Sequence, residues 1–202
     1  MGLGFKYVYG QTPLSNEEKE GLLVKSITTR AELDEFEQLN IEKAIEWTLN
    51  HKFQKEQILT EEYIKYVHKK MFGDVWKWAG KFRKTEKNIG VKWTRIGMEL
   101  KVLMDDTKHW IENNTYSPDE IAIRFKHRLV SIHCFPNGNG RHSRIMADII
   151  IEFIFGKEVF TWNNSKLVEP SNARKEYINS IVDADNGNIE PLLEFARKGK
   201  LN

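Results

Sequence analysis

The chain has 202 residues, of which 31 are Lys or Arg and 29 are Asp or Glu, so its formal net charge is only +2. This balance argues against a protein whose main task is to coat nucleic acid or an anionic membrane, although it leaves room for a local basic pocket. The single cysteine, Cys134, excludes an intramolecular disulfide framework and a multi-cysteine zinc site. With 40% hydrophobic and 30% charged residues, the composition is that of one globular domain of ordinary size.

The apolar stretches, such as the one around residues 149–155, are too short to span a bilayer. The first residues lack the apolar segment of a signal peptide. We therefore expect a cytoplasmic protein without membrane partners. No repeat or linker divides the chain, so we expect residues 1–14 to form an N-terminal arm and residues 15–202 to form a single domain.

Helical periodicity dominates this domain from its beginning. Ser15 with Glu18 forms a capping box, which predicts a short helix up to about residue 23. Thr29 with Glu32 forms a second box, which predicts a longer helix. Its apolar residues are expected to lie mostly on one face, and they are Leu33, Phe36, Ile41, Ala44, Ile45 and Leu49.

The next helix is predicted to begin at Thr60, before residues 73–93 break the helical pattern with glycines and tryptophans. This segment is expected to form a loop and a small β-hairpin. Ser117 followed by Pro118 predicts a strong helix start, and that helix should run to about Ile132. Four more helices are predicted, over about residues 98–113, 140–155, 171–183 and 188–198. The pattern therefore predicts a mainly α domain of about eight helices and one hairpin.

Residues 133–144, His-Cys-Phe-Pro-Asn-Gly-Asn-Gly-Arg-His-Ser-Arg, link two of these helices. The glycines on either side of Asn139 open the second helix, so backbone N–H groups and the positive end of the helix dipole can meet a phosphate. Arg141 and Arg144 lie on one side of the first turn and can bind phosphate oxygens in forked pairs. His133 is the residue type suited to removing a proton near neutral pH. Together these parts indicate attack of a hydroxyl on a phosphate.

Simpler explanations exist for the parts taken singly, because Gly-Asn-Gly is a common loop sequence and a helix-start arginine is often only solvated. Cys134 could suggest a nucleophile, but a buried or inert thiol is favoured. A metal set of His127, His133 and His142 fits no standard zinc spacing.

The tryptophans are interpreted as packing residues rather than as a nucleic-acid platform, and they are Trp76, Trp78, Trp93 and Trp110. Three basic residues are interpreted as the solvated side of their helix, with one able to face a ligand cleft, and they are Arg124, Lys126 and Arg128.

The loop closely resembles the signature of the Fic (Fido) family, usually written H-x-F-x-[D/E]-G-N-G-R-x-x-R. The matching residues are His133, Phe135, Gly138, Asn139, Gly140, Arg141 and Arg144. Residues 78–83, followed by Ile89 and Gly90, are similar to the family's approach to its β-hairpin flap. Residues 27–33 are similar to a bacterial subgroup called mobile mystery protein B.

The resemblance implies a Fic-type helical core and a protein adenylyltransferase, which transfers AMP from ATP to a Ser, Thr or Tyr hydroxyl of a target protein. It implies that His133 is the general base and that Phe135 anchors the loop in the core. The ATP phosphates would be bound by Gly138, Asn139, Gly140, Arg141 and Arg144. The flap would dock the target by strand addition, through Arg83, Lys84, Ile89 and Gly90.

One position departs from the family pattern. The family's Mg²⁺-binding acid is replaced by Asn137, whose amide oxygen is a legitimate ligand but brings no charge. We therefore expect weaker Mg²⁺ binding, or Mg²⁺ held mainly by the phosphates of ATP.

Glu32 has two competing interpretations. In many Fic proteins a helix with the pattern [S/T]-x-x-x-E-[G/N] is inhibitory, and its glutamate pairs with the second arginine of the signature. Thr28 with Glu32 fits the first part of this pattern, so residues 15–50 could be an inhibitory region, but Leu33 replaces the Gly or Asn. In the simpler interpretation, Glu32 is only the capping-box partner of Thr29.

Charge is unevenly divided between these regions. Residues 121–147 contain five Lys or Arg and no acid, whereas residues 15–46 contain nine acids and four bases. This division predicts a basic phosphate pocket with an acidic lid.

Two other functions stay open beside adenylyl transfer. A Fic-type protein could transfer another nucleotide or a phosphate group, or it could be a weakly catalytic nucleotide-binding regulatory partner. The expected partner is a protein target, and no direct nucleic-acid binding is expected. A homo-oligomer or a regulatory protein partner also stays open.

Overall fold

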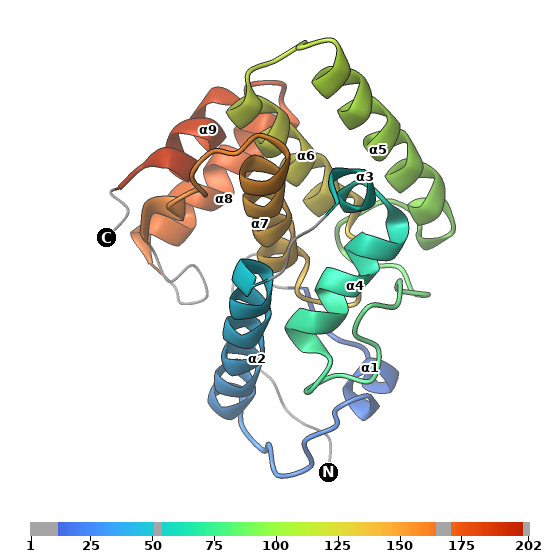
Figure 1. Ribbon diagram of the computed structural model, residues 1–202. Coiled ribbons are helices and arrows are strands. Elements are labelled where there is room, and N and C mark those ends of the chain that lie inside the picture. Colours follow the sequence, from blue (N-terminus) through green and yellow to red (C-terminus); the bar gives the residue numbers. More distant parts are fainter. Residues whose placement is uncertain (1–11, 51–53, 165–170, 200–202) are drawn as a thin grey trace.

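The structure is a computed structural model that describes residues 12–50, 54–164 and 171–199. The helices that lie in these residues (Figure 1) are α1 (Asn16–Glu20), α2 (Arg30–Asn50), α3 (Lys55–Ile58), α4 (Glu61–Phe72), α5 (Ile96–Glu112), α6 (Pro118–Ile132), α7 (Asn139–Ile149), α8 (Asn172–Asp185) and α9 (Glu190–Arg197). Short 3₁₀ turns lie at Trp93–Arg95 and Trp162–Asn164. The mainly α fold is thus confirmed.

The predicted helix starts at Ser15, Thr60 and Ser117 are confirmed, because each side chain accepts a hydrogen bond from the backbone N–H three residues later. The short helix α3 was not predicted. The helix expected over residues 140–155 is divided into α7 and a π-helical turn, Ile150–Ile154. Most of the expected N-terminal arm, residues 1–11, lies outside the described residues.

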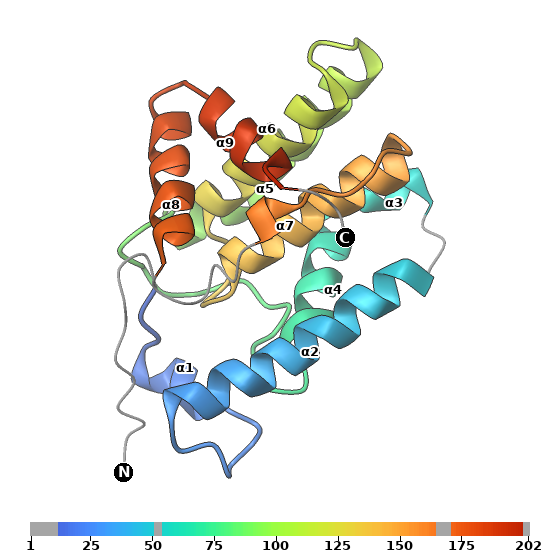
Figure 2. The same cartoon turned by 90° about the vertical axis from the view of Figure 1, so that its left-hand side faces the viewer.

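Helix α7 lies at the centre of the domain, with α8 and α9 on one side and α4 and α5 on the other (Figure 1). It packs against α6 and α4, while α6 also packs against α5 and α2 packs against α4. Figure 2 shows α2 running below α7. Large side chains fill the space between these helices, and Ile64, Leu100, Phe125 and Met146 are fully buried. Since each such side chain contributes about 1.5–3 kcal/mol, this core fixes α6 and α7 relative to each other.

Helix α2 buries only part of the apolar face that was predicted, because Leu33, Ile41 and Ala44 are buried. Phe36, Ile45 and Leu49 are exposed, whereas Glu37 and Asn40 are buried. The Asn40 side chain donates to a backbone carbonyl of α4 at 3.0 Å and accepts from a backbone N–H just after α4 at 2.9 Å. Paired polar groups can be buried at little cost, so these partners decided the orientation of the helix.

Residues 81–92 form an extended loop rather than the predicted hairpin, because no strand pairing is assigned between its two arms in the described part of the chain. Both arms bond instead to the end of α6 and the residues after it. The Arg83 N–H donates to the Cys134 carbonyl at 2.9 Å, and the Val91 N–H donates to the Ile132 carbonyl at 3.3 Å. The loop is therefore attached directly to the segment that carries the signature.

None of the described helices combines the length and the apolar character that crossing a bilayer requires.

Candidate active site

His133 lies at the C-terminal cap of α6, in a left-handed backbone conformation with φ of 59°. The residue is buried, and Arg83 Nε donates to its carbonyl oxygen at 2.7 Å. Burial, followed by the nearby charge of Arg83, lowers the pKa of His133 to about 4. The imidazole is therefore neutral at pH 7 and can accept a proton.

Two side chains of the loop point inward and hold its shape. Phe135 is fully buried and stacks on His68 of α4, with ring centroids 3.7 Å apart. Asn139 accepts a hydrogen bond from the Phe135 N–H at 2.9 Å and donates one to the Phe135 carbonyl at 2.8 Å. The Asn139 side chain thus closes the loop, and only its backbone N–H can serve a phosphate.

The start of α7 offers backbone N–H groups. Gly138 is its N-cap, with φ of 79°, and has no side chain to bond the first N–H groups of the helix. A Cβ atom at Gly138 would lie 2.5 Å from Cζ of Phe72, so this close approach requires glycine. At Gly140 a Cβ atom would meet nothing within 4 Å. Space is therefore open beside the first turn, as an anion site needs.

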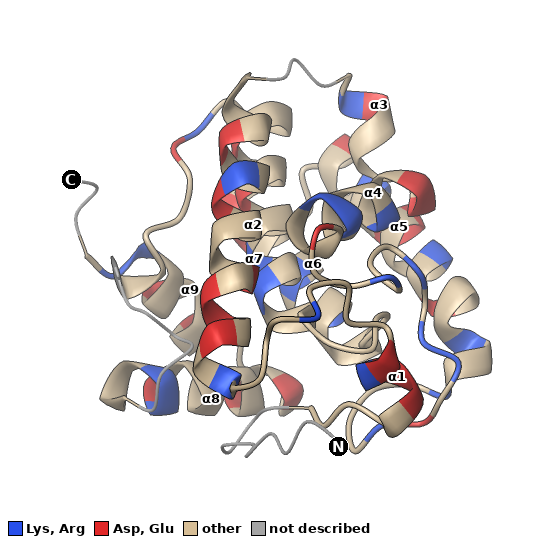
Figure 3. Cartoon of the chain, turned by 90° about the horizontal axis from the view of Figure 1, so that it is seen from below, with Lys and Arg blue, Asp and Glu red and all other residues tan. Residues whose placement is uncertain are grey.

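Three arginines surround this helix start. Arg144 lies over the ring of Tyr177, 5.3 Å from its centroid. Arg174 of α8 is half-buried, and its pKa is lowered first by burial and then by Arg144 and Arg141. Arg141 forms an ion pair with Glu37 of α2 at 2.7 Å. Figure 3 shows the basic turn of α7 beside the acidic turns of α2.

These groups share a cleft of about 570 Å³, a volume that suits a nucleotide-sized ligand. The cleft is bounded by the α6–α7 connection, the loop of residues 81–92, α8 and residues 12–15, here called the N-terminal segment. Among its lining residues are Thr12, Ile89, His133, Gly140, Arg144 and Arg174.

Asn137 is bonded to protein atoms on both sides of its amide. Its Oδ1 accepts from the Gly138 N–H at 2.6 Å, and its Nδ2 donates to the Thr12 carbonyl at 3.2 Å. One lone pair of Oδ1 is left for a cation. In the described ranges, no three His, Cys, Asp or Glu side chains gather closely enough to hold a metal ion. The side chains therefore do not fit a resident metal, and Mg²⁺ would have to enter with the phosphates of a nucleotide.

Glu32 caps α2. Its Oε2 accepts from the N–H groups of Thr28 at 2.8 Å and Thr29 at 2.9 Å and from the Thr28 hydroxyl at 3.1 Å, and Thr29 Oγ1 accepts from the Glu32 N–H at 3.2 Å. The backbone bonds, that from Thr28 first, lower the pKa of Glu32. The ion pairs among the described residues include none between Glu32 and Arg144. The acid of α2 that reaches a signature arginine is Glu37 instead.

The four residues expected to dock a target differ in their exposure and in their contacts. Lys84 and Ile89 are exposed, and Gly90 lies so close to the base that a Cβ atom there would be 2.6 Å from Cβ of His133. Arg83 is buried, and its guanidinium donates to several backbone carbonyls, including that of His133. Arg83 therefore holds the loop and the base together, and its guanidinium is occupied by these bonds.

Three residues of this site were not identified from the sequence, and they are Thr12, Glu37 and Arg174. Thr12 Oγ1 lies 3.1 Å from Nε2 of His133. Of the three, only Glu37 is marked by a local pattern in the sequence, because it lies four residues after Leu33 and so shares the buried face of α2. Thr12 and Arg174 come from segments far from residues 133–144, so no local pattern marks them.

The other chemical candidates have structural explanations. Cys134 is fully buried, and burial raises its pKa to about 12, so the thiol is inert as favoured. His127 bonds to Asp185 at 2.7 Å, and His142 lies 3.0 Å from a backbone carbonyl of α4. Lys126, expected on the solvated side of α6, is instead fully buried beside Tyr177.

Comparisons with known proteins relate the segment that contains residues 133–144 to a family. Residues 58–151 match the Fic/DOC family. The chain is 23% identical to a curated protein from Drosophila grimshawi named "Protein adenylyltransferase Fic", over 95% of this chain and 40% of that protein. It is also 23% identical to a protein of the same name from Nematostella vectensis, over 82% of this chain and 38% of that protein. The chain thus spans less than half the length of these relatives.

Solved structures share the fold. Fic-1 (residues 134–508) from C. elegans has a TM-score of 0.64 and 22% identity, over 92% of this chain and 54% of that chain. The BepC protein from Bartonella tribocorum, crystallised with AMPPNP, has a TM-score of 0.68 and 19% identity, over 89% of this chain and 95% of that chain. The proposed subgroup, based on residues 27–33, stays a prediction.

Proposed function

The chain carries a Fic/DOC-family domain, and on that premise we propose that it is a protein adenylyltransferase, which transfers AMP from ATP to a Ser, Thr or Tyr hydroxyl of a protein. The observation that carries this proposal is one cleft in which a neutral, buried His133 lies beside the anion-binding start of α7. The names of the curated relatives support the same activity.

In the proposed reaction, the target hydroxyl gives its proton to Nε2 of His133 while its oxygen attacks the α-phosphate. Pyrophosphate leaves. The backbone N–H groups at the start of α7, with Arg144 and Arg174, offset the negative charge of the triphosphate. ATP would enter as its Mg²⁺ complex, in which the metal offsets part of the phosphate charge, and Asn137 Oδ1 could add one weak ligand.

Glu37 is proposed to position Arg141. The carboxylate is buried, and Trp76 Nε1 donates to it at 2.6 Å. The ion pair and this hydrogen bond together hold the guanidinium at the side of α7, where it also lies over the Phe72 ring. Restraint of the enzyme by its N-terminal region is a further part of the proposal, and it is supported by the contact of Thr12 with His133 rather than by Glu32.

The test uses the full chain with extract proteins and ATP labelled at either the α- or the γ-phosphate. Transfer of the α-label but not the γ-label is expected, together with its loss in His133→Asn. His109→Asn is the matched control, because His109 is an exposed histidine of α5.

The outcomes separate the alternatives. A γ-label on protein would indicate phosphate transfer, and an α-label from another nucleoside triphosphate would indicate a different donor. Nucleotide binding without any labelled protein would overturn the proposed activity and favour a nucleotide-binding regulatory partner.

A further inference from the structure

The N-terminal segment places a hydroxyl at the proposed base. Thr12 Oγ1 lies 3.1 Å from Nε2 of His133, and the side chain is buried in the lining of the cleft. With the imidazole proton on Nδ1, Nε2 accepts the hydrogen of the hydroxyl. A general base must lie within hydrogen-bond distance of the hydroxyl from which it removes a proton. Thr12 therefore occupies the position that the hydroxyl to be modified would take.

The backbone of the segment is held from two sides. On one side, Asn137 Nδ2 donates to the Thr12 carbonyl at 3.2 Å. On the other side, Lys87 Nζ donates to the Pro13 carbonyl at 3.0 Å. One bond comes from the α6–α7 connection and the other from the loop of residues 81–92. The segment is therefore clamped between the two elements that border the base.

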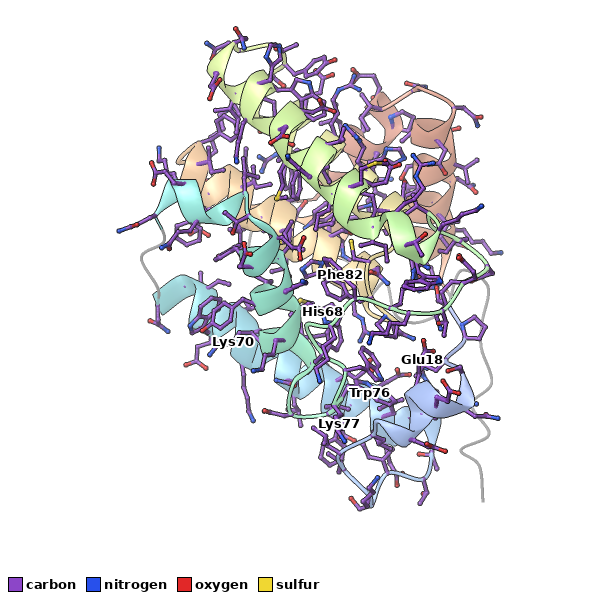
Figure 4. All side chains as sticks on the ribbon, turned by 90° about the vertical axis from the view of Figure 1, so that its right-hand side faces the viewer. Glu18, His68, Lys70, Trp76, Lys77 and Phe82 are labelled. Carbon is purple, nitrogen blue, oxygen red and sulfur yellow. The ribbon has the colours of Figure 1, made fainter. Side chains whose placement is uncertain are left out.

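Helix α1 fixes the other end of the segment. The Ser15–Glu18 capping box begins it, and the Glu18 carboxylate also binds Lys87 at 2.5 Å and the Thr85 hydroxyl at 3.1 Å. Figure 4 shows Glu18 on α1, beside the loop that follows Phe82. The side chains of Glu18 and Lys87 are only 10% and 5% exposed, so this pair is less screened by solvent than a surface pair. Because Thr12 lies three residues before Ser15, the anchored α1 keeps it close to the cleft.

From these contacts we propose that Thr12 is an AMP acceptor, and that the enzyme modifies its own N-terminal segment within one chain. This inference rests on the proposed adenylyl transfer. Thr12 Oγ1 gives its proton to Nε2 of His133 and forms a bond to the α-phosphorus of ATP. The bond from that phosphorus to the bridging oxygen breaks, and pyrophosphate leaves with the electron pair. The product is the AMP ester of Thr12, formed once per chain.

The experiment incubates the full chain with MgATP and locates the adduct by peptide mass spectrometry. One AMP on Thr12 is expected, retained in Thr12→Ser and lost in Thr12→Val, which has the same shape without the hydroxyl. Thr115→Val is the matched control, because Thr115 is exposed in the connection between α5 and α6 and should leave the adduct unchanged. The fraction modified per unit time should not change on dilution, since the reaction is intramolecular.

Extract proteins in the same reaction separate the two proposals. If the wild-type chain labels extract proteins but Thr12 stays unmodified, the inference is overturned and adenylyl transfer stands. If neither is labelled and no pyrophosphate forms, the proposed function itself fails. A rate per chain that rises with protein concentration would overturn modification within one chain.

Discussion

The loop of residues 133–144 and helix α2 meet at the Arg141–Glu37 ion pair, yet their sequences predict their structures unequally. The loop is held largely by its own residues, since the Asn139 side chain bonds both backbone groups of Phe135. Helix α2 is held by partners from elsewhere: Glu37 by Trp76 and Arg141, and Asn40 by the end of α4. A local motif can therefore be identified by spacing, whereas a buried polar face needs the tertiary partners that satisfy it.

The largest effect is expected when His133, the proposed general base, is replaced. Asn tolerates the left-handed backbone of His133, so His133→Asn should fold while losing the proton acceptor. Transfer of the α-label should fall by about 10²–10⁴-fold. ATP binding and the melting temperature should stay close to those of the wild type. Retention of most of the transfer rate would place the base elsewhere.

The pH dependence of transfer is a second test of His133 as the general base. A base acts when neutral, and the pKa of His133 is lowered to about 4. The value of kcat/KM should therefore be flat from pH 7 down to near 5, then fall about tenfold per unit below about pH 4. Circular dichroism at each pH shows whether the chain is still folded. A decline that begins at about pH 6.5, the ordinary value for histidine, would contradict the buried environment.

Glu37→Gln tests the buried polar face of α2. The amide keeps an acceptor for Trp76 but leaves Arg141 without its counter-charge. Loss of one partner of a buried pair costs about 3 kcal/mol, the lower end of the usual range because Arg141 is partly exposed. Urea unfolding measures this loss. Glu35→Gln, on the exposed face of the same helix, should change the unfolding free energy little, and equal effects of the two changes would rule out a structural ion pair.

Two glycines of the loop form a matched pair. Gly138→Ala places a Cβ atom 2.5 Å from the Phe72 ring in a left-handed conformation, so it should destabilise the chain by about 1–3 kcal/mol. Gly140→Ala has open space and a helical backbone, so it should leave stability unchanged or raise it by less than about 1 kcal/mol. Thermal unfolding of both variants is the measurement. A similar loss in both would mean that the approach of Gly138 to Phe72 is not what requires glycine.

The smallest effect is expected for Glu32→Ala. This change removes the side-chain acceptor at the start of α2, so the melting temperature should fall by less than in Glu37→Gln. ATP binding and α-label transfer should stay unchanged, because the carboxylate is bonded to Thr28 and Thr29 rather than to Arg144. Increased transfer or ATP affinity would restore the inhibitory interpretation of Glu32.

Much of the fold follows from local chemistry. Ser15, Thr60 and Ser117 begin helices because their oxygens bond the next N–H groups, a relation contained within four residues. The hairpin expected near Arg83 is a loop instead, since its arms bond the end of α6 rather than each other. That choice depends on a segment about forty to fifty residues away, which no short window of sequence contains.

A mainly α domain, the spacing that brings His133 to the start of α7, and the glycines that let an anion approach could all be predicted from the sequence. Packing between distant segments was needed to show which glutamate meets Arg141, that Arg174 joins the cleft, and that the Thr12 hydroxyl lies at Nε2 of His133. The difference arises because capping bonds and glycine conformations depend on residues only a few positions apart in the sequence. A buried charge or hydroxyl is placed by groups that only packing brings together.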